Sequence, residues 1–404
     1  MEFYHDILEN LLDKLIDYRG KTPKKTLSGV PLVTAKIVKN GTINGYTEYI
    51  AEEDYDKWMV RGFPKVGDVI LTTEAPLGEV ALLKEEKVAL AQRIVCLRGK
   101  DNVLDNTYLK YYLQSGKGQK SLSARESGTT VTGIKQAELR RVDIEYPAYD
   151  DQRRIASILS SLDRKIELNN KINADLEEMA QAIFKNWFVD FEPFKDGKFV
   201  DSELGMIPEG WKVGRLEDIA NIVGGSTPSK AKPEYYTQKG IAWLTPKDLS
   251  SHPAVYSSRG EIDITQEGYN STSTKLMPRG TVLFTSRAPI GYISIAQNDI
   301  CTNQGFKSLV PRKAGTCFLY CFLKYVTPEI ENKSTGSTFK EASGALMKSL
   351  QVIMPEQKVF EEFEEIVSPL FARIESLEKE NSRLSLLRDT LLPRLMSGEL
   401  EVPE

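Results

Sequence analysis

Two long stretches of the chain repeat apolar positions at alternating spacings of four and three residues. The first series is Ile155, Leu159, Leu162, Ile166, Asn169, Asn173, Leu176, Ala180, Ile183 and Trp187. The second series is Phe363, Val367, Leu370, Ile374, Leu377, Asn381, Leu384, Arg388, Leu391 and Leu395. A 3.5-residue period is typical of the seam of a coiled coil. The pattern predicts two long helices that pair antiparallel; the alternative is that each helix packs on its own globular neighbour.

Two details of these seams carry further expectations. An offset of 208 residues superimposes Ile166 on Ile374 and Asn173 on Asn381. A buried Asn in each seam is expected to fix the register of pairing at a cost in stability. Pro369 lies inside the second seam, and because proline lacks an amide donor it predicts that a new helical segment starts there.

Outside the seams, the apolar runs are short and end at turns rich in Gly and Pro. Runs at 67–73, 93–98 and 280–286 predict strands, and runs at 106–115 and 317–326 predict helices. This mixture is typical of an α+β domain of roughly 150 residues. The same order of runs occurs in both halves of the chain.

The two halves are a tandem duplication. The stretch ILTTEAPLGEVALL (70–83) matches LFTSRAPIGYISIA (283–296), and residues 128–147 match 336–355 without a gap. The matched frame keeps its apolar positions but changes Glu74 into Arg287. We therefore predict two α+β domains, 1–149 and 201–355, followed by helical spacers, 150–200 and 356–404, with an internal pseudo-two-fold repeat.

The net charge of −4 masks an uneven distribution. Residues 1–149 contain 22 basic and 21 acidic side chains, and residues 201–355 contain 17 and 14. The spacers are acidic, with 8 basic and 10 acidic side chains in 150–200 and 6 and 12 in 356–404. The acidic total therefore does not exclude a basic, nucleic-acid-binding surface on either domain.

The sequence lacks the usual traces of an active site. It contains no phosphate-binding GxxxxGK[ST] motif and no methyltransferase motif, and His5 and His252 stand alone. Cys96, Cys301, Cys317 and Cys321 are expected to be buried thiols rather than metal ligands or disulfides. No signal peptide or membrane segment is evident, so we expect a cytoplasmic protein. Because the histidines are isolated and the cysteines lack further ligands nearby, we expect no bound metal.

Four stretches resemble the specificity subunit of type I restriction-modification systems. They are DQRRIASILSSLDRKIELNNKIN (151–173), AIFKNWFVDFEPF (182–194), LGMIPEGWKV (204–213) and LLPRLMSGEL (391–400). The resemblance covers the whole chain. One departure is that the second helix ends in LPRLMSGELEVP in place of the FKNWFVDFEP junction that ends the first.

The resemblance implies a protein that is not itself catalytic. Each domain is then a target recognition domain that binds one half of a split, asymmetric site on double-stranded DNA. The helices set the gap between half-sites and dock two methyltransferase subunits, and restriction subunits complete the complex. S-adenosylmethionine, ATP and Mg²⁺ are implied for the partner subunits, with no cofactor bound by this chain.

Candidate DNA contacts are polar residues on loops where the two copies share a backbone, because Arg, Asn and Gln suit base edges and Lys, Ser and Thr suit phosphates. The first copy supplies Thr34, Lys36, Thr73, Glu74, Gln92, Arg93, Arg125, Thr129, Thr130 and Lys135. The second copy supplies Thr245, Lys247, Ser286, Arg287, Asn303, Gln304, Lys333, Ser337, Thr338 and Lys340. Each can also be read as an ordinary solvent-facing or capping residue.

Candidate contacts for the methyltransferase subunits lie near the helix ends. They are Phe184, Trp187, Phe188, Phe191, Leu391, Leu395 and Met396, each of which is equally compatible with a place in the protein's own core. Two other functions are compatible with the sequence. One is a self-contained enzyme, and the other is a coiled-coil scaffold with two protein-binding heads and no role in DNA binding.

Overall fold

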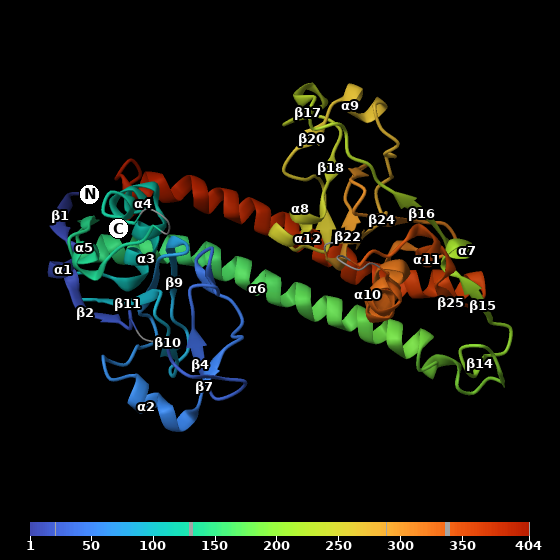
Figure 1. The fold of residues 1–404 in the computed structure, drawn as a ribbon, viewed down its shortest axis with the longest axis horizontal. Helices are drawn as coiled ribbons and strands as arrows, with labels where there is room; N and C mark the ends of the chain where they lie inside the picture. Colours follow the sequence, from blue (N-terminus) through green and yellow to red (C-terminus); the bar gives the residue numbers. More distant parts are fainter. Residues whose placement is uncertain (21, 129–131, 288, 336–339, 404) are drawn as a thin grey trace. The chain divides into compact units, whose positions relative to one another are not determined.

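The chain folds into two compact units (Figure 1), and the computed structural model describes residues 1–20, 22–128, 132–287, 289–335 and 340–403. Unit 1 comprises Met1–Ile166 and Ser382–Glu404, and unit 2 comprises Glu167–Asn381. Two 40-residue helices, α6 (Tyr149–Phe188) and α12 (Gln357–Met396), contribute to both units. Each unit therefore combines one copy of the repeat with portions of both predicted spacers.

In the described part of unit 1, two four-stranded sheets form the first copy. One sheet has the order β2-β11-β8-β9, with β2 Leu12–Asp17, β11 Ile94–Gly99, β8 Val69–Thr73 and β9 Leu77–Leu82. The other has the order β10-β4-β7-β3, with β10 Ala89–Leu90, β4 Val30–Val33, β7 Tyr49–Ile50 and β3 Lys25–Thr26. The pairs β1 (Phe3–Ile7) with β12 (Asp143–Pro147) and β5 (Val38–Lys39) with β6 (Thr42–Ile43) are antiparallel. The helices are α1 (Leu8–Leu11), α2 (Tyr55–Trp58), α3 (Asn106–Gln114), α4 (Gly116–Ser123) and α5 (Gln136–Arg140).

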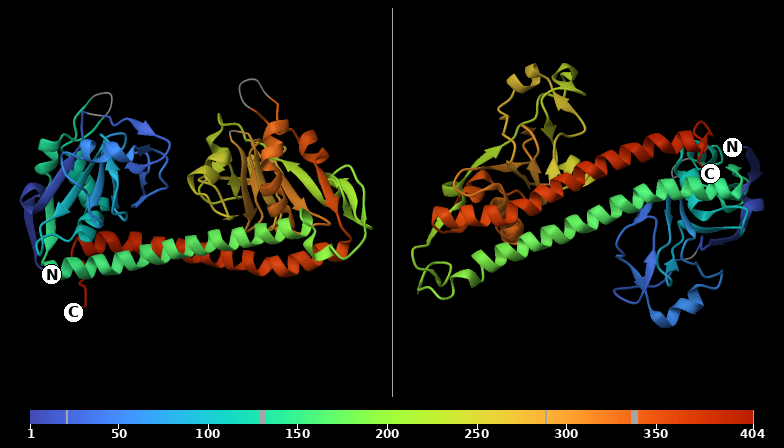
Figure 2. Two further views of the ribbon diagram at one scale, coloured as in Figure 1. Left: turned by 90° about the horizontal axis from the view of Figure 1, so that it is seen from below. Right: turned by 180° about the vertical axis from the view of Figure 1, so that it is seen from behind.

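Unit 2 contains a five-stranded sheet among its described residues. Its order is β16-β24-β21-β22-β19, with β16 Ala220–Gly224, β24 Lys307–Pro311, β21 Val282–Ser286, β22 Ile290–Ala296 and β19 Tyr256–Ser257. The two-stranded pairs are β13 (Phe199–Val200) with β14 (Ile207–Pro208), β15 (Lys212–Arg215) with β25 (Gln351–Met354), β17 (Tyr236–Thr237) with β20 (Asp263–Ile264), and β18 (Trp243–Leu244) with β23 (Cys301–Thr302). The helices are α7 (Leu216–Ile219), α8 (Pro246–Ser251), α9 (Gln266–Asn270), α10 (Thr316–Lys333) and α11 (Gly344–Ser349), and α10 lies against β22 (Figure 2).

Matching hydrogen bonds show that the duplication extends to the backbone. The Thr72 hydroxyl accepts from the amide of Glu79 at 2.9 Å, and the Thr285 hydroxyl accepts from the amide of Tyr292 at 2.8 Å. Gly78 and Gly291, which follow the two turns, share φ values of +94° and +96° that favour glycine. The strands predicted at 67–73, 93–98 and 280–286 and the helices predicted at 106–115 and 317–326 are confirmed.

Each unit has its own hydrophobic core. In unit 1, Ile155 and Leu159 of α6 and Leu395 of α12 pack with the first copy. In unit 2, aromatic rings dominate the contact between the helices and the second copy, with Phe188 4.9 Å from Phe318 between ring centroids and close to edge-on. Such buried aromatic contacts supply much of the apolar area that stabilises a unit.

The predicted break at Pro369 is wrong, because α12 continues through it to Met396. A proline inside a helix leaves the carbonyl four residues earlier without its amide donor. Here that carbonyl belongs to Glu365, and both Glu365 and Pro369 are exposed. Water can therefore satisfy the carbonyl, which reduces the cost of keeping the helix intact.

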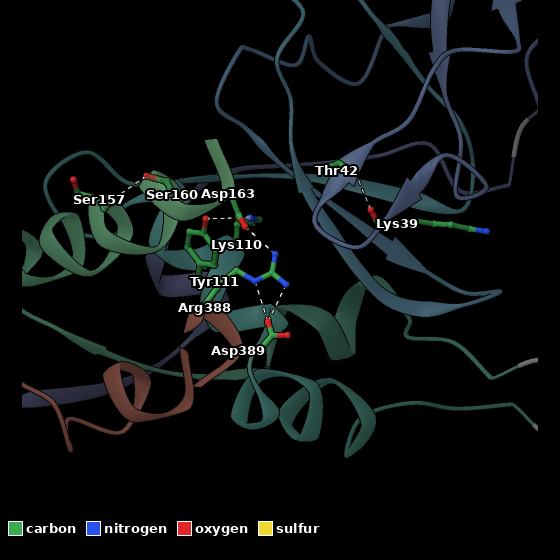
Figure 3. A network of polar contacts seen from close by, with 9 residues as sticks. All are labelled: Lys39, Thr42, Lys110, Tyr111, Ser157, Ser160, Asp163, Arg388 and Asp389. Atoms are coloured by element: carbon green, nitrogen blue, oxygen red, sulfur yellow. Dashed lines mark hydrogen bonds and ion pairs between the residues drawn. The ribbon is translucent and has the colours of Figure 1, made fainter. Parts of the chain in front are cut away.

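A partly buried carboxylate connects both long helices to the first copy in unit 1 (Figure 3). Asp163 of α6 accepts hydrogen bonds from the Lys110 ammonium at 2.8 Å, the Tyr111 hydroxyl at 2.6 Å and the Arg388 guanidinium of α12 at 2.9 Å. Burial by itself raises the pKa of Asp163, but these partners outweigh burial and lower it. Asp163 is therefore charged at neutral pH.

In unit 2 the long helices hold the second copy through several carboxylates. Glu364 of α12 accepts from the amide of Phe318 at 2.8 Å, at the start of α10. Glu375 binds the Arg279 guanidinium through both oxygens, at 2.9 and 3.1 Å. Glu378 accepts from the amides of Val255 and Tyr256 at 2.7 and 3.0 Å. Glu364 and Glu378 of α12 thus satisfy backbone donors of the second copy, and Glu375 binds one of its arginines.

We predict that Asp163→Ala lowers the free energy of unfolding by about 2–4 kcal/mol, because it leaves the buried Lys110 ammonium without its carboxylate. The expected loss is at the lower end of the range for buried pairs because the side chain of Asp163 is 26% exposed. Urea denaturation measures the change. The control is Glu362→Ala, which removes an exposed pair with Lys358 on α12 and should cost under about 1 kcal/mol. Equal losses in the two variants would contradict this role of Asp163.

A second prediction concerns Glu378, whose pKa is raised to about 7, first by burial and despite the two backbone hydrogen bonds. Its unfolded pKa is about 4.3, so the folded state binds the extra proton between these values and stability rises as the pH falls from about 7. Unfolding at pH 6 should therefore require about 1 kcal/mol more than at pH 8. Glu378→Gln keeps an acceptor for the amides but cannot titrate, so this part of the pH dependence should disappear. An unchanged profile in the variant would reject the assignment.

Candidate nucleic-acid interface

In the first copy, backbone hydrogen bonds bring together three loops that carry candidate DNA contacts. They are the turn after β8, the residues before β11 and the loop before α5. The amide of Thr73 donates to the carbonyl of Arg93 at 3.0 Å, and the amide of Ile134 donates to the carbonyl of Thr73 at 2.9 Å. A single residue at the end of β8 therefore ties all three loops together.

The second copy repeats this junction. The amide of Ser286 donates to the carbonyl of Gly305 at 2.8 Å, and the amide of Ala342 donates to the carbonyl of Ser286 at 2.9 Å. The turn after β21 and the two other loops thus meet as they do in the first copy. Candidate residues that lie about 50 positions apart in the sequence share one site in each copy.

The charged side chains at the two junctions are paired differently. In the first copy, Glu74 forms an ion pair with Arg93 at 3.0 Å. In the second copy, Arg287 and Lys307 contact Glu341 at 3.6 and 3.5 Å. Except for Lys307, which is 17% exposed, the side chains in these pairs are between 36% and 52% exposed, so water screens the pairs and each is worth at most about 1 kcal/mol. Such pairs can exchange partners at little cost.

Burial argues against Thr73 and Ser286 as DNA contacts, which corrects the expectation that they lie on loops, because they are the last residues of the buried strands β8 and β21. They are 2% and 0% exposed, respectively. The Ser286 hydroxyl donates to the carbonyl of Gly305 at 3.2 Å, and the Thr73 hydroxyl has no hydrogen-bond partner among the described residues. Both side chains face the interior of the junction.

A cleft of about 940 Å³ lies beside the junction in unit 2. Four candidate residues line it: Thr245, Lys247, Arg287 and Asn303. Thr245 caps α8, where its amide and hydroxyl both donate to Asp248 at 2.7 Å. Lys247 is exposed, and its hydrogen bond to Glu261 raises its pKa, so it is protonated at neutral pH. The lining of the cleft includes three cations, two side-chain amides and two acids: Lys230, Lys247, Arg287, Gln238, Asn303, Asp248 and Glu261.

The remaining candidates, apart from those in the loop before α5 and its counterpart in the second copy, differ in their exposure and contacts. Thr34 and Gln92 are half-buried, whereas Lys36 is exposed. Gln304 forms a hydrogen bond with Thr227. The Asn303 side chain accepts from the amide of Gly305 at 2.8 Å, so it also acts as a local cap.

Several candidates in the loop before α5 and in its counterpart in the second copy form contacts within the protein. Arg125 contacts Glu138 and Asp143 at 3.5 and 3.3 Å. Lys135 is exposed before α5. Lys333 forms an ion pair with Glu329 at 2.6 Å, and Lys340 donates to the carbonyl of Glu331 at 3.3 Å. Thr129, Thr130, Ser337 and Thr338 lie outside the described residues.

Four of the seven candidate partner contacts are core residues. Phe184 and Phe188 are buried in unit 2, and Leu395 and Met396 are buried in unit 1. Of the two expectations for these four residues, burial favours a place in the protein's own core, because their apolar surface is already covered. Trp187, Phe191 and Leu391 are only partly buried.

Sequence reasoning missed Glu341, Lys307 and Gly305. The signal for Glu341 was present, because the gap-free match of 128–147 to 336–355 places it on Gly133. Within this match, a change from glycine to a charged residue indicates a position where the two copies differ in charge. Trp243 is 4% exposed and also lines the cleft.

The described residues include all four cysteines and can be searched for metal ligands and membrane-spanning helices. All four cysteines are buried and free, which confirms the expectation of buried thiols. Among the described residues, no cluster of three His, Cys, Asp or Glu side chains could hold a metal ion. Nor does any helix in the same ranges have the length and apolar character needed to span a membrane.

Comparison with known proteins assigns the family. Residues 13–178 and 208–386 match the family described as type I restriction modification DNA specificity domain. The type I restriction enzyme MjaIX specificity subunit of Methanocaldococcus jannaschii is 30% identical over 408 residues, covering 95% of this chain and 91% of that protein. The HindI specificity subunit of Haemophilus influenzae is 27% identical over 342 residues, covering 70% and 74%.

A solved structure extends the likeness to the fold. The S subunit of a type I restriction-modification system from M. genitalium has a TM-score of 0.60 and 19% identity, covering 100% of this chain and 97% of that one. The family match covers both copies of the repeat and most of the chain. The chain therefore belongs to the family of type I restriction-modification specificity subunits.

Proposed function

We propose that each copy of the repeat binds one half of a split, asymmetric site on double-stranded DNA. The observation that carries this proposal is the pair of three-loop junctions, which share their backbone hydrogen bonds but differ in their charged side chains. One scaffold with two sets of polar groups suits two different base sequences. The cleft beside Arg287 adds a concave surface with cations suited to phosphates and guanine.

The long helices serve as the spacer in this proposal. Within unit 2, the Asn169 side chain donates to Asn381 at 2.9 Å, and 15 residues further along α6 Phe184 contacts Phe363 of α12, 18 residues earlier than Asn381. This order is that of antiparallel helices. We infer that α6 and α12 form a coiled coil whose length, about 60 Å for 40 residues, sets the distance between the half-sites.

The chain itself supplies recognition and no catalysis. Partner methyltransferase subunits, two in number, use S-adenosylmethionine to methylate adenine N6, which requires the base to leave the stack. Restriction subunits that use ATP and Mg²⁺ complete the cytoplasmic complex. Partly buried apolar side chains on the helices, including Trp187 and Leu391, remain candidates for docking.

The experiment that tests this function is methylation mapping across the genome of a cell that expresses the chain with a matching methyltransferase subunit. The expected result is a split motif with methylated adenines that disappears when the chain is deleted. A partner that is demonstrably active but methylates no such motif would contradict the proposal. In that case a two-headed scaffold without DNA binding becomes the better explanation.

A further prediction tests the spacer. Inserting one heptad into α6 and one at the facing position of α12 adds about 10 Å, or about three base pairs, between the copies. We expect the gap in the methylated motif to lengthen while both half-site sequences stay the same. A control with alanine replacing exposed Lys171 tests for general effects of changing the helix. If the half-site sequences themselves change, the helices do more than set distance.

A further inference from the structure

Three equivalent positions at the two junctions carry the same kinds of residue in a different order. Their equivalence follows from the shared backbone hydrogen bonds of the junctions. The positions are Glu74, Arg93 and Gly133 in the first copy, and Arg287, Gly305 and Glu341 in the second. Each copy therefore has one acid, one arginine and one glycine, but no position keeps its type.

This permutation changes which loops the ion pair connects. In the first copy the pair joins the turn to the second loop, through Glu74 and Arg93. In the second copy it joins the turn to the third loop, through Arg287 and Glu341. The pair thus lies on opposite sides of the turn in the two copies.

The glycines occupy positions with no space for a side chain. A Cβ atom on Gly133 would lie 2.8 Å from the carbonyl oxygen of Thr73 and 2.9 Å from the Cβ of Glu74. A Cβ atom on Gly305 would lie 2.8 Å from the Cγ of Pro246. Gly305 and Arg287 both line the cleft of unit 2. With no side chain at position 305, the guanidinium of Arg287 has access to the cleft from the turn.

Resting on the proposed function in DNA recognition, we propose that Glu341 is a specificity-determining residue that holds Arg287 in the free protein and releases it to guanine. Guanine O6 and N7 can accept two hydrogen bonds from one guanidinium, whereas Arg287 approaches Glu341 through a single N–O contact of 3.6 Å, so guanine offers Arg287 the better partner. A phosphate also carries negative charge, but it is present at every base pair and so does not distinguish one base sequence from another. Contact with a non-target phosphate must therefore compete with the Glu341 carboxylate.

The charge around Arg287 supports this role. Glu341 contacts both Arg287 and Lys307, so one carboxylate faces two cations at the junction. Its removal leaves both cations without this counter-charge and increases attraction for any DNA backbone. In the first copy Glu74 holds Arg93 in the same way, so the two copies present their arginine from different loops. We infer that guanine occurs in both half-sites and is contacted from a different loop in each.

The test compares Glu341→Gln with the unchanged chain, each in complex with a matching methyltransferase subunit. The probes are a random duplex library and one duplex without the target site. Glu341→Gln should bind the non-target duplex about two- to fivefold more tightly, the range of a screened ion pair, while affinity for the target duplex changes less. The requirement for one base pair should relax in the second half-site only. Glu217→Gln on α7 removes the same charge from an exposed pair with Arg215, the last residue of β15, and should change neither property.

A conservative variant separates base contact from phosphate contact. Arg287→Lys keeps the positive charge but loses the bidentate geometry, so it should weaken the preference for guanine while the affinity for the non-target duplex stays the same. Thermal unfolding verifies that each variant is folded. The inference is overturned if Glu341→Gln strengthens target and non-target binding equally with no change in selected sequence. If the unchanged complex selects no sequence from the library, the proposed function itself fails.

Discussion

The three-loop junction of each copy depends on one residue whose backbone amide and carbonyl bond to two different loops. Thr73 and Ser286 hold these positions, and both are buried. A buried backbone group that lost its partner would cost about 1–3 kcal/mol, so the junction has little freedom to open. The hydrogen bonds involve only the backbone, and the side chains around them can differ without disturbing the junction. The same scaffold can therefore carry Glu74 in one copy and Arg287 in the other.

The elements of this fold could be predicted from the sequence more fully than the site. The strands β8, β11 and β21 end in or beside the apolar runs that predict them, because a buried run of this length has few alternatives. Pro369 misled the prediction, since the sequence does not show that the carbonyl of Glu365 faces solvent. Thr73 and Ser286 misled it as well, because the sequence assigned them to loops, whereas they end the buried strands β8 and β21. Ion pairs such as Arg287 with Glu341 depend on loop geometry that no local pattern encodes.

The two copies are attached to the long helices by different chemistry, although they share a fold. Asp163 in unit 1 is surrounded by Lys110, Tyr111 and Arg388, and the attachment is an ion pair network. In unit 2, Glu364 and Glu378 instead accept hydrogen bonds from backbone amides of the second copy. Substitutions near the two attachments therefore weaken different interactions. A change of pH affects the stability of the two attachments in opposite directions, because the pKa is lowered at Asp163 and raised at Glu378.

The asparagines of the helix seam have a consequence for cooperativity. Asn169 and Asn173 are buried in place of apolar residues, and each has a side-chain oxygen without a hydrogen-bond partner among the described residues. They lie where α6 passes from unit 1 to unit 2, next to the division at Ile166 and Glu167. Each unit has its own hydrophobic core, so we expect the units to unfold as separate foldons. Damage to one copy would then leave the other folded, and the protein would lose one loop junction rather than both.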